Sequence, residues 1–310
     1  MLDFTSFSIQ PDDSGRRIDR IVRRLMPETP LSSIYRLFRK GLIRFNGQRV
    51  TPGFLVPSTG QLLIASMLLA HTPDISLDRT PEIIPDTSGI ERIHETGDIV
   101  FINKPSGISV HGPDSLESLI PQSEGARESL SFRSGPLHRL DKDTSGLIAF
   151  SRSLRGARWF SHALHARQIQ KYYVGIVSGF LDITARWQDV GDGQSEMVTD
   201  VHTLLAGSDS SLLCFHLITG KKHQIRIQCA SHGHPLIGDK RYGATDNHKT
   251  FFLHSWKMIF PEESLPGLPH QLTASLPARF SREILDRFGD NVLALLDDRA
   301  IYWSDNEEPQ

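Results

Sequence analysis

The segment 138–146, His-Arg-Leu-Asp-Lys-Asp-Thr-Ser-Gly, holds the residue types in this chain that are best suited to chemistry. Asp141 lies two positions after an arginine and precedes a Thr-Ser-Gly turn, and a strand-like apolar run follows at 147–150. Turn residues of this kind place an acid at the end of a sheet, where a substrate can reach it. An ionised carboxylate there can act as a nucleophile or as a base.

Two simpler interpretations of this segment remain open at this point. An ordinary charged turn would contain the same residue types. A hydrolytic triad of Ser145, His138 and Asp141 is also conceivable. It lacks the Gly-x-Ser-x-Gly elbow, however, and it lies within nine residues, a span in which triad geometry is hard to build.

The histidines of the chain also raise the question of a metal site. His232 and His234 lie close together, and Cys229 comes just before them. Their spacing matches neither Cys-x-x-Cys nor His-Glu-x-x-His. We therefore expect no metal.

The bulk composition places the chain among ordinary globular proteins. Its 310 residues suit one large domain with a smaller one, and 38% hydrophobic and 23% charged residues are typical values. No apolar run reaches the roughly 18 residues that a membrane span needs, and residues 1–13 do not resemble a secretory signal. The two cysteines form no disulfide framework. These features predict a cytoplasmic protein without a membrane partner.

Charge is distributed unevenly along the chain. Residues 15–50 contain ten lysines and arginines against two acids, a local net charge of +8 in a chain whose total is −2. Such asymmetry suggests a basic module facing a polyanion. The alternative is a solvated helical face, but the imbalance is large for a surface that only confers solubility.

The basic region has the signals of two helices and a hairpin. Apolar residues recur at helical spacing from Ile18, and a second helix is expected with Thr29 as its cap, Pro30 in its first turn and Gly41 at its end. An Asn-Gly pair at 46–47 separates two short apolar runs, which is typical of a type I′ hairpin turn.

Several motifs together resemble the RluA-type pseudouridine synthases, which isomerise uridine to pseudouridine in RNA. The nine residues at 138–146 match the family's catalytic motif, and Asn-Lys-Pro-Ser-Gly at 103–107 matches without change. Further matches are Lys-Tyr-Tyr at 171–173, Thr-Gly-Lys-Lys-His-Gln-Ile-Arg at 219–226 and the run 233–243. The resemblance implies an isomerase that needs no cofactor.

The resemblance also implies roles for individual residues. Asp141 corresponds to the catalytic aspartate and Arg226 to the arginine that pairs with it. An adjacent guanidinium favours the ionised form of a carboxylate. Tyr173 corresponds to the family's tyrosine, whose ring can stack on an extruded uracil and whose hydroxyl could help to remove the proton from carbon 5. A structural tyrosine packed in a sheet is the simpler alternative.

Residues flanking these three are expected to bind the substrate. In the family, the motif's arginine, here Arg139, enters the duplex in place of the flipped base, although it could instead contact phosphate. The predicted substrate-binding residues are His138, Arg139, Thr144, His223 and Gln224. The chain departs from the family pattern at Lys221, where arginine is usual, and at Gln228, where histidine is usual.

The basic module resembles the small RNA-binding domain of ribosomal small-subunit protein four. Lysine and arginine bind a phosphate backbone by releasing its counterions. The cations expected to contact RNA are Arg16, Arg17, Arg36, Arg39, Lys40 and Arg44.

The expected fold is α+β. Strands at 99–103, 171–177 and 212–217 alternate with helices near 153–167 and 223–232, which predicts a mixed or largely antiparallel sheet. We expect a basic RNA-binding domain over 1–65, a linker over 66–92 and a catalytic domain over 93–276. A mobile loop is expected over 112–136. The extension 277–310 should contain a docked helix near Phe280 and an acidic tail.

The function predicted from the sequence is isomerisation of specific uridines, preferably in large-subunit ribosomal RNA, by base flipping and an aspartate. Transfer RNA is the alternative substrate. A non-catalytic RNA-binding or ribosome-assembly protein on the same scaffold is the alternative from another class. The protein is expected to be a monomer.

Overall fold

A computed structural model of the chain describes residues 3–69, 90–112, 114–120, 129–191 and 195–289. Backbone contacts divide the chain into two compact units. Unit 1 comprises Met1–Pro85, Pro121–Gly135 and Ser151–Arg158, and unit 2 comprises Asp86–Ile120, Pro136–Phe150 and Trp159–Gln310. None of the helices in the described ranges is both long and apolar enough to cross a bilayer.

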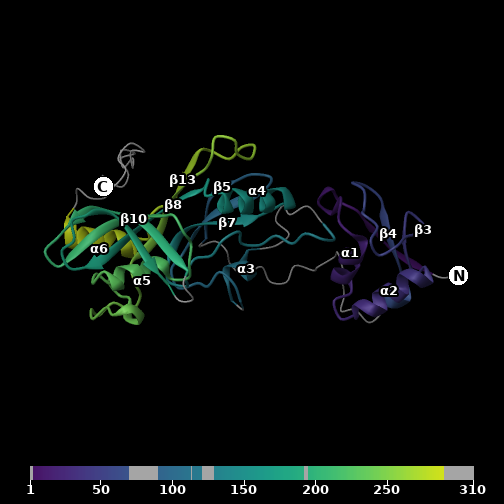
Figure 1. Cartoon of the computed structure of the whole chain (residues 1–310), viewed down its shortest axis with the longest axis horizontal. Helices are drawn as coiled ribbons and strands as arrows, with labels where there is room; N and C mark the ends of the chain where they lie inside the picture. The colour runs from purple at the N-terminus through teal and green to yellow at the C-terminus, as the bar shows by residue number, and fades with distance from the viewer. Residues whose placement is uncertain (1–2, 70–89, 113, 121–128, 192–194, 290–310) are drawn as a thin grey trace. The chain divides into compact units, whose positions relative to one another are not determined.

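Unit 1 contains a small four-stranded sheet with two helices (Figure 1). The strand order is β1-β4-β2-β3, and the helices pack their apolar stripes onto a core that includes Ile18, Ile34 and Leu62. Its elements are β1 (Phe4–Ser8), η1 (Pro11–Asp13), α1 (Ile18–Leu25), α2 (Leu31–Lys40), β2 (Ile43–Phe45), β3 (Gln48–Arg49), β4 (Gln61–Ala65) and η2 (Ser66–Leu68).

The helix and hairpin signals of the basic region correspond closely to these elements. Gly41 ends α2 in the left-handed conformation, at φ 68°. Asn46 and Gly47 both have positive φ, as a type I′ turn between β2 and β3 requires. The predicted cap of α2 is wrong: Pro30, not Thr29, is the N-cap, because the carbonyl of Pro30 accepts the first helical hydrogen bonds, from the backbone N–H groups of Ser33 and Ile34.

Two segments distant in sequence join unit 1 through buried carboxylates. Asp13 is fully buried and accepts hydrogen bonds from the hydroxyls of Ser129 and Ser131 at 2.7 and 2.6 Å. Asp12 accepts the backbone N–H of Leu154 at 3.1 Å. The sequence placed both segments in the large domain, so unit 1 contains more of the chain than the predicted 1–65.

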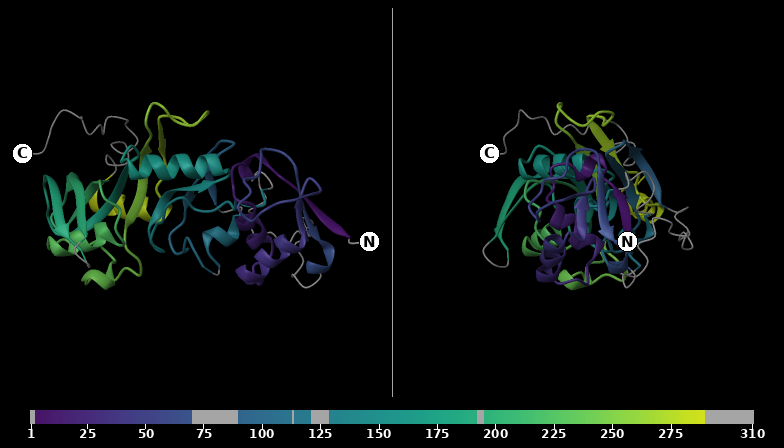
Figure 2. Two further views of the ribbon diagram at one scale, coloured as in Figure 1. Left: turned by 45° about the vertical axis from the view of Figure 1, so that its right-hand side comes forward. Right: turned by 90° about the vertical axis from the view of Figure 1, so that its right-hand side faces the viewer.

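Unit 2 is built on one nine-stranded sheet with the order β5-β6-β7-β12-β8-β11-β10-β9, and β13 pairs with β12 (Figures 1 and 2). The β7–β12 pair is parallel, whereas β12–β8, β8–β11, β11–β10 and β10–β9 are antiparallel. The α+β class and the mixed, mostly antiparallel sheet are thus confirmed. The strands are β5 (Glu91–Glu95), β6 (Ile99–Lys104), β7 (Ser145–Ser151), β8 (Gln170–Ser178), β9 (Thr184–Val190), β10 (Glu196–Ala206), β11 (Ser210–Leu217), β12 (Leu253–Ile259) and β13 (Gln271–Thr273).

Helices cover both faces of this sheet. Alternation along β8 sends Tyr172 to the face on which α6 packs and Tyr173 to the face on which α5 packs. The helix α4 packs through Phe160 against the face opposite α5. The helices and single turns are α3 (Leu116–Leu119), α4 (Leu154–His165), α5 (Gln224–Ser231), η4 (Lys240–Tyr242) and α6 (Ala278–Phe288).

One glycine fixes how the segment 138–146 enters the sheet. Gly146, the second residue of β7, has φ 108°, and a Cβ atom there would lie 2.2 Å from the backbone oxygen of Ser255 on β12. Only glycine permits this approach of two backbones. The turn that carries Asp141 therefore runs directly into the centre of the sheet.

The remaining expectations differ in outcome. The region 112–136 contains a short helix, α3, because Ser115 and Ser118 form a capping box and Leu116 is buried; residues 121–128 lie outside the described ranges. Most of the expected linker, 70–89, also lies outside them. The docked helix near Phe280 is confirmed as α6, in which Phe280 and Ile284 are buried. The acidic tail falls outside the described residues.

Candidate active site

A cavity of about 570 Å³ opens in unit 2, a size typical of ligand pockets. It contains the site residues that the sequence predicted for the large domain, although they come from distant parts of the chain. Those that line it are His138, Arg139, Asp141, Thr144, Tyr173, His223, Gln224 and Arg226.

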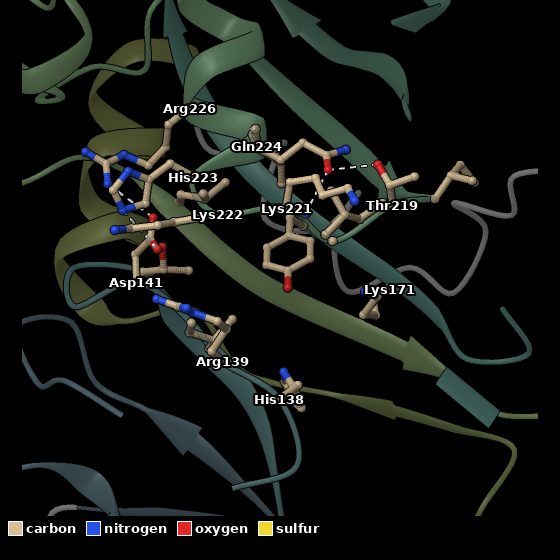
Figure 3. Close-up of a pocket in the computed structure, with 18 of the residues that line it drawn as sticks. His138, Arg139, Asp141, Lys171, Thr219, Lys221, Lys222, His223, Gln224 and Arg226 are labelled. Carbon is tan, nitrogen blue, oxygen red and sulfur yellow. Dashed lines mark hydrogen bonds and ion pairs between the residues drawn. The ribbon is translucent and has the colours of Figure 1, made fainter. Parts of the chain in front are cut away.

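Three elements bring the main groups together (Figure 3). Asp141 lies in the turn before β7, Tyr173 lies on β8, and Arg226 lies in the first turn of α5. The N-cap of α5, His223, is left-handed at φ 57°, and its side chain points toward Asp141. The turn and the helix meet at the end of the pocket where Asp141 and Arg226 face each other.

Asp141 is held by one guanidinium and lies near one imidazole. Arg226 donates from Nη1 to Oδ2 of Asp141 at 3.1 Å, and Nε2 of His223 lies 3.6 Å from Oδ1. Burial lowers the pKa of His223, an effect that the nearby Asp141 charge opposes and the Arg226 charge reinforces. His223 is therefore neutral at neutral pH, and Arg226 supplies the positive charge beside the carboxylate.

Arg226 has a second and stronger partner that the sequence reasoning missed. Asp239 is 1% exposed and accepts hydrogen bonds from Nε and Nη2 of Arg226 at 2.7 and 2.8 Å. Burial acts to lower the pKa of Arg226, but Asp239 and Asp141 outweigh it and leave the pKa above its ordinary value. The guanidinium also lies over the rings of Phe251 and Tyr242, 4.3 and 4.9 Å from their centroids.

Tyr173 borders the pocket but is mostly buried, with 5% of its surface exposed. Burial raises its pKa to about 12, and the Asp141 charge adds to this effect while a hydrogen bond with Ser255 opposes it. The phenol is thus protonated at neutral pH. The position of the Tyr173 ring at the border of the pocket is compatible with base stacking. Its protonated hydroxyl is a poor base for removal of the proton from carbon 5.

Two of the predicted substrate-binding side chains are engaged with the protein itself. His138 accepts the backbone N–H of Ala149 at Nε2 and stacks on Phe160, and burial lowers its pKa to about 3. Gln224 accepts from the Thr219 hydroxyl and the Lys221 N–H, and it donates to Val198 and Thr199. All four hydrogen-bonding sites of this amide are occupied. This geometry favours positioning roles for both side chains, and their contact with substrate stays a prediction.

The other two predicted contacts differ in exposure. Arg139 is exposed at the pocket and free to reach a large substrate, as insertion into a duplex would require. Thr144 is buried, and its backbone N–H donates to the Asp141 carbonyl at 3.2 Å, which closes the turn that carries the acid.

A buried lysine stabilises the turn that carries Asp141. Lys104, at the end of β6, is fully buried and donates from Nζ to the carbonyls of Pro105, Ile108 and Lys142 at 2.9, 2.8 and 2.8 Å. Burial lowers its pKa to about 8, against the opposing charges of Asp143 and Asp141. The Asn-Lys-Pro-Ser-Gly match marked this residue in the sequence but did not indicate its role.

The cations predicted for the basic module lie in unit 1 and vary in availability. Arg36, Arg39 and Lys40 are exposed on α2. Arg17 is paired with Asp19 at 2.8 Å, and Arg44 bonds the Gly41 carbonyl. Arg16 is half-buried.

The pocket can therefore perform acid–base or nucleophilic chemistry at a single carboxylate. Asp141 is the only acid among the described residues that line it. No group of three or more potential metal ligands occurs in the described residues.

Comparison with known proteins matches this site and fold to one family. The family model described as RNA pseudouridylate synthase matches residues 98–231. Ribosomal large subunit pseudouridine synthase D of Xylella fastidiosa is 30% identical over 265 residues, which cover 78% of this chain and 77% of that protein. Ribosomal large subunit pseudouridine synthase C of Haemophilus influenzae is 27% identical over 303 residues, 87% of this chain and 93% of that protein.

The solved structures agree at the level of the fold. Human RNA pseudouridylate synthase domain containing 4 superposes with a TM-score of 0.50 at 24% identity, over 63% of this chain and 91% of that one. The sequence relatives, the matched family model and the shared fold agree with the motifs. The chain belongs to the RluA-type family of RNA pseudouridine synthases.

Proposed function

We propose that this enzyme isomerises specific uridines in large-subunit ribosomal RNA, with Asp141 as the catalytic residue. The observation that carries the proposal is the 3.1 Å bond from Arg226 to Asp141, at a pocket where Asp141 is the only acid among the described lining residues. A guanidinium bonded to a carboxylate fixes the orientation of that carboxylate.

The chemistry needs the target uridine to leave its helix and enter this pocket. The Asp141 carboxylate then either attacks the anomeric carbon of the ribose or takes a proton beside it. Both routes break the bond from the sugar to the ring nitrogen. The uracil rotates while it is held and bonds to the sugar through carbon 5, and at this step Asp141 leaves the anomeric carbon or returns its proton to the sugar. Carbon 5 then loses its proton, and the released ring nitrogen gains one. Tyr173 offers a ring on which the base can stack during the rotation.

Large-subunit ribosomal RNA is proposed because the two bacterial relatives carry it in their names and align over most of their length. Transfer RNA, the alternative substrate, is in the name of neither relative. We further propose that the predicted domain 1–65 supplies RNA affinity through the exposed cations of α2, that the enzyme acts as a monomer, and that it works in the cytoplasm, where ribosomal RNA is assembled.

The decisive test compares pseudouridine maps of total RNA from cells with the gene, without it, and with Asp141→Asn in its place. Isomerisation does not change mass, so sites must be found by chemical labelling of pseudouridine. We expect one or more large-subunit sites to disappear in the deletion and to remain absent with Asp141→Asn. Sites lost only from transfer RNA would refute the ribosomal substrate. Normal modification by Asp141→Asn would refute the catalytic assignment.

A further inference from the structure

Lys171 is a cation of the pocket that the chemistry at Asp141 does not use. It lies on β8, half-buried, and its side chain lines the cavity. Within the described residues its ammonium makes no hydrogen bond or ion pair, unlike that of the buried Lys104, which uses all three donors. Burial lowers its pKa to about 8, so it is mostly charged at neutral pH. A partly buried ammonium without a counter-charge is costly unless a ligand supplies one.

The described residues that line the cavity offer Lys171 no unpaired acid. Six cations line the cavity: Arg139, Arg167, Lys171, Lys221, Lys222 and Arg226. Asp141 is the only described carboxylate among the lining residues, and Arg226 already binds it. Figure 3 shows Lys171 well apart from Asp141, beside the loop that contains Thr219. This end of the pocket is therefore positive and uncompensated, which favours an anionic ligand.

The loop beside Lys171 lies close to the ammonium. A Cβ atom built on Gly220 would lie 3.4 Å from Nζ of Lys171, so the missing side chain lets the ammonium approach the loop backbone while Lys171 still lines the cavity. The loop itself is held from behind, because Gln224 bonds both Thr219 and Lys221. The cation and the rigid loop form one wall of the cavity.

Strand geometry relates Lys171 to the tyrosine on which the uracil would stack. Side chains two apart on a strand project on the same face, about 7 Å from each other. Lys171 and Tyr173 thus face the pocket together, and Tyr172 between them packs on the opposite face with the α6 cluster. That separation suits a base on one residue and a backbone phosphate on the other.

We propose that Lys171 binds a phosphate of the RNA backbone directly flanking the flipped uridine, and so sets the position of the nucleotide relative to Asp141. The proposal rests on the proposed function, since it concerns the same pocket. Lys171 acts here as a substrate-binding residue and takes no part in bond breaking.

The test uses the full-length enzyme and a synthetic RNA hairpin that spans a mapped target site, with tritium on carbon 5 of the uridine. Formation of pseudouridine releases this tritium to water, which measures turnover. Lys171→Met should raise KM about 10- to 100-fold, the value of a hydrogen bond to a charged group, and should change kcat much less. Lys171→Arg should restore most of the loss, which also shows that the fold tolerates substitution at this position.

The matched control is Lys257→Met on the neighbouring strand β12. Lys257 is also a largely buried lysine with a lowered pKa, but it lies over the Trp256 ring and outside the pocket lining. Its substitution should leave both KM and kcat unchanged.

The phosphate itself is identified by neutral methylphosphonate linkages placed 5′ or 3′ of the target uridine. One of the two should raise the KM of the wild type and have little further effect on Lys171→Met. Additive losses at both linkages, or an unchanged KM for Lys171→Met with an active wild type, would overturn this inference alone. A wild type that releases no tritium from any ribosomal RNA would instead overturn the proposed function and the inference with it.

Discussion

Arg226 is bound more closely by Asp239 than by Asp141. Two bonds of 2.7 and 2.8 Å join Arg226 to Asp239, whereas one of 3.1 Å joins it to Asp141. Bidentate pairing fixes both the position and the plane of a guanidinium. Asp239 therefore neutralises the buried cation and leaves a single N–H donor directed at Asp141, whose second oxygen stays available for chemistry.

This arrangement predicts that Asp239→Asn reduces catalysis without a matching loss of binding. The asparagine side chain is uncharged and has one acceptor oxygen, so it cannot hold Arg226 with two charge-assisted bonds. The guanidinium is then free to turn toward Asp141 and neutralise it. We expect kcat to fall by about 10- to 100-fold, the value of one or two charge-assisted bonds, with KM little changed. Steady-state tritium release measures both constants.

A second arginine–aspartate pair in unit 2 provides the control for this prediction. Asp200 is also buried and is bound by Nε and Nη2 of Arg186, and neither residue lines the pocket. Asp200→Asn should lower the free energy of unfolding about as much as Asp239→Asn does, and it should leave kcat unchanged. Equal losses of kcat in both variants would mean that Asp239 matters only for folding.

Lys104→Met should destabilise the protein severely. The substitution removes the shared donor of three carbonyl oxygens, those of Pro105, Ile108 and Lys142. Each buried acceptor left unpaired costs about 1–3 kcal/mol, so we expect the free energy of unfolding to fall by several kcal/mol. Urea unfolding followed by fluorescence would show it. A midpoint within the error of the wild type would contradict the support that we assign to this lysine.

The sequence was most informative where the signal is local. The stripe of α1, the glycine that ends α2 and the Asn-Gly turn all rest on residues close in the chain, and the structure contains each element. The strand β9 was missed because it lies at the edge of the sheet and buries only Trp187, so no apolar alternation appears. The strand β10 was missed because Asp200 and other polar residues interrupt its apolar pattern.

The candidate site was predictable only in part for the same reason. Asp141 and Arg226 are 85 positions apart, and family resemblance, not local pattern, predicted that they meet. Asp239 has the sequence context of a charged surface turn, Gly-Asp-Lys-Arg, and only the fold shows that it is buried. The full use of Gln224 by Thr219, Lys221, Val198 and Thr199 likewise depends on contacts that no short motif encodes.

Two buried histidines predict a loss of stability in mild acid. Burial lowers the pKa of His138 to about 3 and that of His254 to about 4, from an ordinary value of 6.5. Below pH 6.5 the unfolded chain takes up protons that the folded protein does not, so stability is full above that pH and is lost as the pH falls. As the pH falls from 6.5 to 5, each histidine should lower the free energy of unfolding by about 1.5 kcal/mol.

Substitution of one histidine isolates its share of this effect. His254 bonds Ser145 at 2.9 Å and the Ala274 carbonyl at 3.2 Å, and its side chain is not among those that line the pocket. His254→Gln should lower stability at pH 7.5 and show a weaker decline toward pH 5 than the wild type in urea unfolding. Parallel pH curves for the two proteins would show that His254 does not titrate as described.

The basic module should contribute affinity through the exposed cations of α2. Replacement of Arg36, Arg39 and Lys40 by glutamine leaves the core of unit 1 intact, because all three side chains are exposed. A truncation of 1–65 would be a poorer test, since it removes Asp12 and Asp13, which bind segments near 130 and 154. We expect weaker binding to structured ribosomal RNA, with a salt dependence reduced by about 2 in log–log slope if all three contact phosphate.

Arg17→Gln gives a comparison within the same module. Its guanidinium is already bound to Asp19 by bonds of 3.1 and 2.8 Å, so it has less charge to offer a phosphate. The single variant should change the slope by clearly less than one third of the triple effect. Filter binding at salt concentrations from about 50 to 300 mM, roughly a sixfold range, measures both slopes. An unchanged slope in the triple variant would assign RNA affinity to the catalytic domain instead, because counterion release must follow the cations that touch the backbone.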